Sequence, residues 1–150
     1  PGPALVGRGG RGFLVSAATS EAGKSRGGLG GILPAWVVLV ALHSYAVGVF
    51  LLFATEWGAR FGGFGEVSPL FFARQAGVFH FVLATAYLVE WFVHGGLVIM
   101  ISAKAMAVAF LVAMWLLGVD AWSVPLSAAG DTVMGVATFV LSRRIRAKPA

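Results

Sequence analysis

Residues 96–118 read GLVIMISAKAMAVAFLVAMWLLG, an apolar run whose only charged residue is Lys104. A helix rises about 1.5 Å per residue, so a run of this length can cross the roughly 30 Å hydrocarbon core of a bilayer. Three further runs of similar character occupy residues 34–54, 69–92 and 123–142. The sequence therefore predicts an all-α protein, a membrane-embedded four-helix up-down bundle.

The composition of the chain supports the same class. The 150 residues are 59% hydrophobic and only 11% charged, whereas soluble domains are about half apolar and a quarter charged. The chain has no cysteine, which excludes disulfides, thiol chemistry and cysteine-bound metals. It also lacks HExxH, GxSxG and paired catalytic carboxylates. The sequence thus favours a non-catalytic protein over an enzyme and predicts no metal site.

The two ends of the chain differ from the middle. Residues 1–33 are rich in glycine, which predicts a flexible N-terminal tail. Within that tail, residues 18–25 (ATSEAGKS) resemble a loosened phosphate-binding loop, but the glycines that follow leave no helix to complete it, so no nucleotide is expected. Residues 34–142 form the membrane domain, which begins with Pro34 in a first helical turn. Residues 143–150 form a basic C-terminal tail.

The placement of basic residues predicts the orientation of the chain in the membrane. Cytoplasmic segments are enriched in Lys and Arg. The tails carry Arg8, Arg11, Lys24, Arg26, Arg143, Arg144, Arg146 and Lys148. An even number of spans places both termini on one side, so both are expected in the cytoplasm, beneath a bacterial-type inner (plasma) membrane. The basic tails then serve topology or contact anionic lipid, and no nucleic-acid partner is expected.

Each predicted span carries one ionisable residue near its middle. These residues are His43, His80, Lys104 and Asp131. Such groups are costly in a membrane and are kept when they face the bundle interior, pair with each other or mark a functional path. Counted from the inner helix ends, all four lie roughly 12–18 Å deep. We expect one polar layer, in which Lys104 neutralises Asp131.

Other polar and aromatic residues lie nearer the outer and inner ends. Arg74 and Gln75 lie near the outer end of the second span, where we expect the arginine side chain to reach the membrane surface. Tyr87 shares a helical face with the mid-membrane histidine of that span. Glu90 lies near the inner end and is expected to meet His94 or a tail arginine. A lipid headgroup is a further candidate partner of the arginine and of the glutamate.

The long first loop, residues 55–68, is expected to hold an interfacial half-turn anchored by aromatic residues.

Four interpretations of the polar layer remain open. It is a structural device that fixes helix register, or it holds a small-molecule or lipid-like ligand. It is alternatively a haem b site with His43 and His80 as axial ligands. The fourth interpretation is a proton or ion relay through both histidines and Asp131. Outside the haem alternative, no cofactor is expected. Small residues along the helices predict close helix contacts, including contacts with other membrane subunits or a second copy of the chain.

Three features of residues 34–142 carry a resemblance. They are the single long first loop, the small-residue stretch RQAGVFHFVLATAYL at 74–88, and an acid before a glycine in GDTVMG at 130–135. In these features the chain resembles small bacterial four-helix membrane proteins of the DoxX-like type. Some members of that group are tied to respiratory or thiol-redox complexes. A chain without cysteine could not itself perform thiol chemistry.

Overall fold

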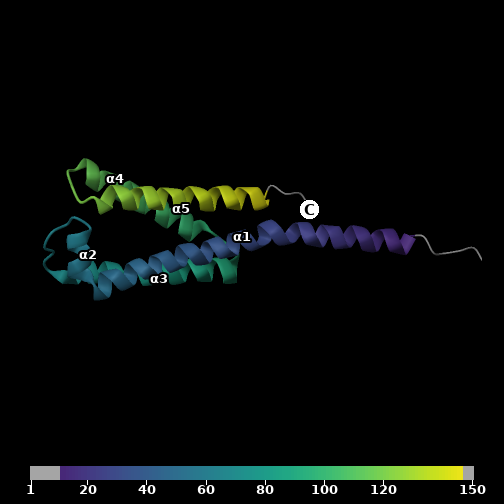
Figure 1. Ribbon diagram of the computed structural model, residues 1–150, viewed down its shortest axis with the longest axis horizontal. Helices are drawn as coiled ribbons and strands as arrows, with labels where there is room; N and C mark the ends of the chain where they lie inside the picture. Colours follow the sequence, from purple (N-terminus) through teal and green to yellow (C-terminus); the bar gives the residue numbers. More distant parts are fainter. Residues whose placement is uncertain (1–10, 147–150) are drawn as a thin grey trace, which may run out of the picture. The chain divides into compact units, whose positions relative to one another are not determined.

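The computed structural model describes the backbone of residues 11–146 and the side chains of residues 31–144. This part of the chain contains helices and no strand (Figure 1). The helices are α1 (Arg11–Phe53), α2 (Thr55–Phe61), α3 (Leu70–His94), α4 (Val98–Leu116) and α5 (Ser123–Arg146). The expectation of an all-α fold is confirmed for the described residues.

Four helical segments are long and apolar enough to cross a membrane. They are Gly31–Phe53, Leu70–His94, Val98–Leu116 and Ser123–Arg144. Their mean hydropathies lie between 1.5 and 2.2. The four predicted spans agree with these segments to within a few residues, because glycine and proline mark the ends. Gly95 ends α3 in a left-handed conformation with φ 65°, and Gly118 follows α4 with φ 93°.

The start of α1 differs from the expected one. We expected Pro34 in the first turn of the first span, but α1 begins at Arg11 and Pro34 lies inside the helix. Extending a helix requires far less free energy than starting one, so an apolar helix can continue backwards through a glycine-rich segment. Residues 11–33, expected as a flexible tail, therefore have a helical backbone. Residues 1–10 and the side chains of the phosphate-loop-like stretch 18–25 lie outside the described residues.

The helices α1 and α3 lie side by side and meet at two glycines (Figure 1). A Cβ atom on Gly77 would lie 2.9 Å from the carbonyl oxygen of Gly48, and the reverse distance is also 2.9 Å. Both distances are too short for any side chain. The Tyr45 hydroxyl is hydrogen-bonded to the Thr85 hydroxyl at 2.8 Å. Small residues are the usual means by which helices approach closely in lipid.

The connection between α3 and α4 is held by Glu90. Its two carboxylate oxygens accept the backbone N–H groups of Val98 at 2.6 Å and Ile99 at 2.8 Å. An anion at this place satisfies free amides and the positive end of the helix dipole. Glu90 therefore caps α4, whereas we expected it to meet His94 or a tail arginine.

The buried core lies between the spans, towards the end where α3 meets α4. It contains Leu33, Val37, Val40, Tyr87, Leu97 and Met100. The indole N–H of Trp36 on α1 donates to the hydroxyl of Thr138 on α5 at 3.0 Å. At the other end, the indole N–H of Trp122 donates to the carbonyl of Phe61 at 2.6 Å. Hydrogen bonds thus join α5 to α1 at one end and to α2 at the other.

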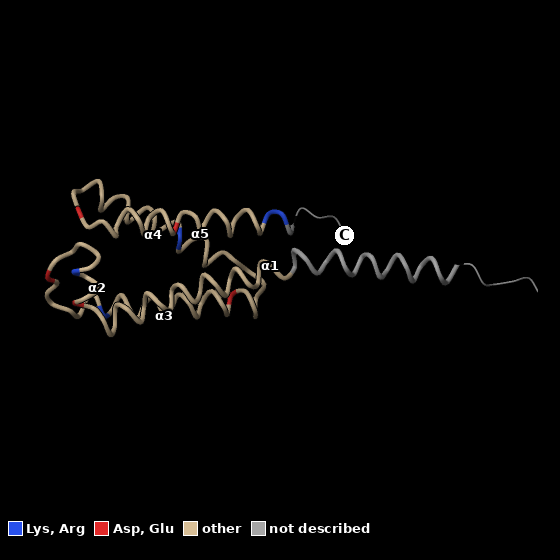
Figure 2. The backbone as a smooth tube through the Cα atoms, viewed as in Figure 1, with Lys and Arg blue, Asp and Glu red and all other residues tan. Residues whose placement is uncertain are grey.

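Most other large apolar side chains of the described residues point outward. Phe53 is 83% exposed and Leu116 is 76% exposed. Charged positions lie mainly near helix ends, and the charges of α4 and α5 also include a pair midway along the helices (Figure 2). An apolar exterior with so few charges is typical of a surface that faces lipid.

Candidate functional site

Lys104 and Asp131 form an ion pair between α4 and α5. The Lys104 Nζ atom lies 2.6 Å from Asp131 Oδ1, and the two side chains are only 7% and 16% exposed. Gly135 lies one turn beyond the aspartate, and a Cβ atom there would lie 3.3 Å from Lys104 Cβ. The glycine therefore lets the lysine stem pass close to α5. Each charge neutralises the other in a setting where a lone charge is costly.

His80 on α3 lies near this ion pair. Its ring is partly buried, and it is close enough to interact electrostatically with Lys104, Asp131 and His43. The Nδ1 atom of His80 is buried and has no hydrogen-bond partner within the described residues. Tyr87, only 2% exposed, lies two turns further along the same face of α3 and interacts electrostatically with Asp131. The structure thus gathers these side chains into one neighbourhood between α3, α4 and α5.

His43 on α1 is more exposed than the residues around the ion pair. Its side chain is exposed and lines a cavity of about 750 Å³, which we call the α2 cavity. The walls come from α1, α2, α5 and the loop after α2, and include His43, Thr55, Trp57, Phe61, Trp122 and Ser127. Small-molecule sites commonly have volumes of about 300–1,000 Å³. We expected His43 in the buried layer, but its side chain is exposed and faces this cavity, whereas the adjacent Ser44 is buried.

Contacts between residues 61–62 and residues 122–123 lie in the wall of the α2 cavity. The Trp122 ring packs edge-on against Phe61, with centroids 5.3 Å apart. The Ser123 hydroxyl donates to the Gly62 carbonyl at 2.7 Å. The sequence predicted an interfacial half-turn anchored by aromatic residues in the loop 55–68. The structure has the short helix α2 at the start of this loop. The cavity itself could not be found from the sequence, since its walls come from residues far apart in the chain.

A second hollow lies beside the ion pair. Lys104 and Asp131 line a groove of about 420 Å³ between α4 and α5, together with Ala105, Thr132 and Gly135 among others. This α4–α5 groove is open and mostly apolar. The ion pair therefore borders a surface that lipid or another helix can contact. The small residues on both sides are typical of helix contacts in membranes.

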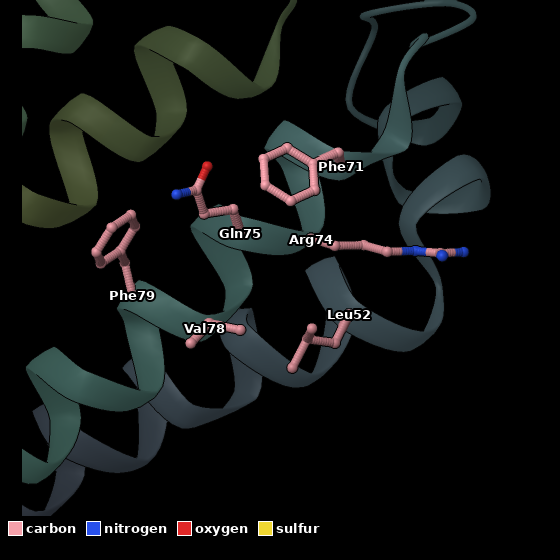
Figure 3. A pocket seen from close by; sticks show the side chains of 6 residues that line it. All are labelled: Leu52, Phe71, Arg74, Gln75, Val78 and Phe79. Carbon is pink, nitrogen blue, oxygen red and sulfur yellow. The ribbon is translucent and has the colours of Figure 1, made fainter.

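The remaining residues singled out from the sequence lie elsewhere. Arg74 and Gln75 are exposed and line a third groove of about 520 Å³ near the start of α3 (Figure 3). Arg74 is thus near a helix end, as expected for a side chain that reaches the membrane surface. Glu90 caps α4, as described above. Of the candidate site residues, His80 and Tyr87 lie near the Lys104–Asp131 pair, and Arg74, Gln75 and Glu90 lie elsewhere. His43 interacts electrostatically with His80 but lines the α2 cavity.

The two histidines do not line a common cavity here. His43 lines the α2 cavity, but His80 is not among its lining residues. Bis-histidine haem ligation requires both rings on opposite faces of one porphyrin-sized space, so the geometry gives no specific support to that alternative. Within the described residues, no group of three or more His, Asp or Glu side chains could hold a metal ion.

Comparisons with protein-family models, with curated proteins and with solved structures give no match. The class of the protein is therefore defined by its fold and its cavities. Its described residues form helices, four of them apolar enough to cross a membrane, with a charge pair between two of these and a largely apolar cavity beside the short helix α2.

Proposed function

We propose that the chain is a four-span, up-down bundle of a bacterial-type inner membrane, with both termini in the cytoplasm. We further propose that it binds an uncharged amphipathic molecule in the α2 cavity, as a non-catalytic membrane subunit or ligand-binding protein. The four apolar helices and their exposed apolar side chains support membrane insertion. The cavity supports the ligand.

The lining of the α2 cavity carries the proposal. No Asp, Glu, Lys or Arg is among the residues that line it. Aromatic rings form one part of the wall, and Trp57 stacks on Phe61 with centroids 5.2 Å apart and planes 4° from parallel. An uncharged molecule with an extended apolar body fits such a surface, because a charged one would leave its hydration without gaining a counter-charge.

The polar groups of the cavity limit where the ligand's own polar group can lie. The Thr55 hydroxyl already donates to the Leu51 carbonyl at 2.6 Å, and the Ser123 hydroxyl donates to the Gly62 carbonyl. His43 and Ser127 remain as side chains that can bond to a ligand. We therefore expect the polar group of the ligand near His43 and its apolar body along the aromatic wall.

Tryptophan fluorescence can test this proposal. Trp57 and Trp122 line the cavity, so a bound brominated ligand would quench them. The probe is bromoundecanol, with bromoundecanoate as its charged counterpart, added to the purified full chain in detergent micelles. We expect saturable quenching by the alcohol and much weaker saturable quenching by the carboxylate. Quenching that rises without saturation would show partition into the micelle only and would contradict the proposal.

Matched variants locate the binding site. Ala46 lines the α2 cavity, whereas Ala105 lines the α4–α5 groove. Ala46→Phe should abolish saturable quenching because it fills the cavity, and Ala105→Phe should preserve it. His43→Leu should weaken binding of the alcohol about two- to tenfold, the effect of losing one hydrogen bond. Equal binding by all three variants would place the probe elsewhere.

A further inference from the structure

The start of α3 carries an arginine that no carboxylate neutralises within the described part of the chain. The ion pairs found there join Arg60 to Glu66 at 3.6 Å and Lys104 to Asp131 at 2.6 Å. Arg74 is exposed and lies about one turn into an apolar helix that begins at Leu70. In a membrane this depth corresponds to the headgroup region, where a flexible cation can meet phosphate.

A groove of about 520 Å³ begins at this arginine. Besides Arg74 and Gln75, its lining side chains are the apolar Leu52, Phe71, Val78 and Phe79. Figure 3 shows Gln75 between two aromatic rings, while the Arg74 side chain extends in a different direction. Arg74 therefore supplies the positive charge of the groove at a point away from Gln75, and the remaining lining side chains are apolar.

Part of the apolar lining, Val78 and Phe79, lies deeper along α3 than the arginine, whereas Phe71 precedes the arginine in the chain. Val78 follows Arg74 by one helical turn, which corresponds to about 6 Å along the axis. Leu52 of α1 contributes to the same surface. A ligand that fits this arrangement has a negative charge at one end and a hydrocarbon chain at the other.

We propose that this groove binds one anionic phospholipid in the leaflet on the α2 side. Its phosphate contacts the Arg74 guanidinium, and an acyl chain lies along Leu52 and Val78. Charge complementarity selects the anion, since the groove contains no acidic side chain. The apolar lining favours a lipid over free phosphate. The inference rests on the membrane-spanning part of the proposed function, and it concerns a different surface from the α2 cavity.

Native mass spectrometry of the full chain tests the proposal. The protein is reconstituted in vesicles of equal phosphatidylglycerol and phosphatidylcholine, extracted in mild detergent, and scored for lipid that stays bound. We expect the wild-type chain to retain phosphatidylglycerol in preference. Arg74→Gln should lower that preference about fivefold, the effect of one basic side chain near a membrane surface. Arg74→Lys should keep part of it, because the charge remains.

Arg60→Gln is the matched control, since this arginine also lies at the α2 end but is paired with Glu66. Its lipid preference should match that of the wild-type chain. Equal retention of both lipids by the wild-type chain, or an unchanged preference in Arg74→Gln, would overturn the proposal. Displacement of the bound lipid by inorganic phosphate alone would do the same, because it would show an anion site without a lipid.

The outcomes also separate this inference from the proposed function. Carbonate washing of the vesicles shows whether the chain is inserted in the membrane. Release of the chain by this wash would count against the membrane assignment itself. A chain that stays inserted without lipid preference would contradict only the phospholipid site. Arg74→Gln should bind bromoundecanol as the wild-type chain does, because Arg74 does not line the α2 cavity.

Discussion

The ammonium group of Lys104 lies midway along an apolar helix, 2.6 Å from a carboxylate oxygen of Asp131. Transfer of either charge alone into a low-dielectric environment carries a desolvation penalty of several kcal/mol. The pair offsets much of that penalty through mutual attraction. Removing one partner leaves a buried charge without compensation, whereas removing both charges leaves an uncharged contact. The stability of the fold should therefore depend strongly on whether the residues are changed singly or together.

We predict that Lys104→Met and Asp131→Asn each lower the free energy of unfolding by about 3–5 kcal/mol. The double variant should lose much less than the sum of the two, because no unpaired charge remains. The measurement is a double-mutant cycle from denaturant unfolding of the purified chain in micelles. Additive effects of the two changes would contradict a direct ion pair.

The residue scale also shows which site features a sequence can predict. The Lys104–Asp131 pairing could be expected because opposite charges at similar depth in neighbouring spans have few other partners. The role of Glu90 could not, since its partners are backbone amides of Val98 and Ile99. Backbone groups leave no trace in residue identity. The exposure of His43 depends on how α1 is rotated about its axis. The sequence does not predict this rotation, because polar residues do not mark one face of the helix.

Among the elements, α1 and α3 are brought together by glycine. Gly48 and Gly77 are each buried, and each would place a Cβ atom 2.9 Å from the other's carbonyl oxygen. The obstructing atom is backbone, which cannot rotate away as a side chain can. Any larger residue must push the two helices apart and disturb the contacts beyond the crossing, including the Tyr45–Thr85 hydrogen bond.

We predict that Gly77→Ala lowers the free energy of unfolding by about 1–3 kcal/mol, because it overpacks the crossing. Gly130→Ala is the control. A Cβ atom on Gly130, in helix α5, would meet nothing within 4 Å, so this change should be neutral or stabilise by up to about 1 kcal/mol through helix propensity. Denaturant unfolding in micelles measures both. Equal stability of the two variants would argue against a close crossing.

The ends of helices were predictable where a glycine marks them. Gly95 and Gly118 follow the ends of α3 and α4 with positive φ angles, which glycine adopts without strain. The start of α1 was not predictable, because Pro34 fits both a first helical turn and, with the loss of one hydrogen bond, a helix interior. Only the helix around it decides between the two.

At the scale of the whole molecule, the proposed four-span topology places both termini on one side of the bilayer. The absence of cysteine makes this testable with single introduced cysteines. We predict that Glu66→Cys reacts with a membrane-impermeant maleimide in intact spheroplasts, because its loop should face outward. Ala150→Cys should react only after permeabilisation, because the basic tails should remain inside.

The unmodified chain is the background control for this labelling, since it contains no thiol. Reaction of both cysteines from the same side would show an odd number of spans. Reaction of Ala150→Cys alone in intact cells would show the opposite orientation.

The sequence by itself determined that the chain is helical and that four segments are long and apolar enough to span a bilayer. It also determined that two of these segments each carry one charged residue, Lys104 or Asp131, near the middle of the segment. These properties depend on local length, hydropathy and backbone punctuation, which residue identity carries. Only the tertiary structure decided that α2, Trp122 and Ser123 line a cavity together with His43, and that Glu90 caps α4. Those features depend on the rotation and contact of helices distant in the chain, and these are set by packing rather than by any single segment.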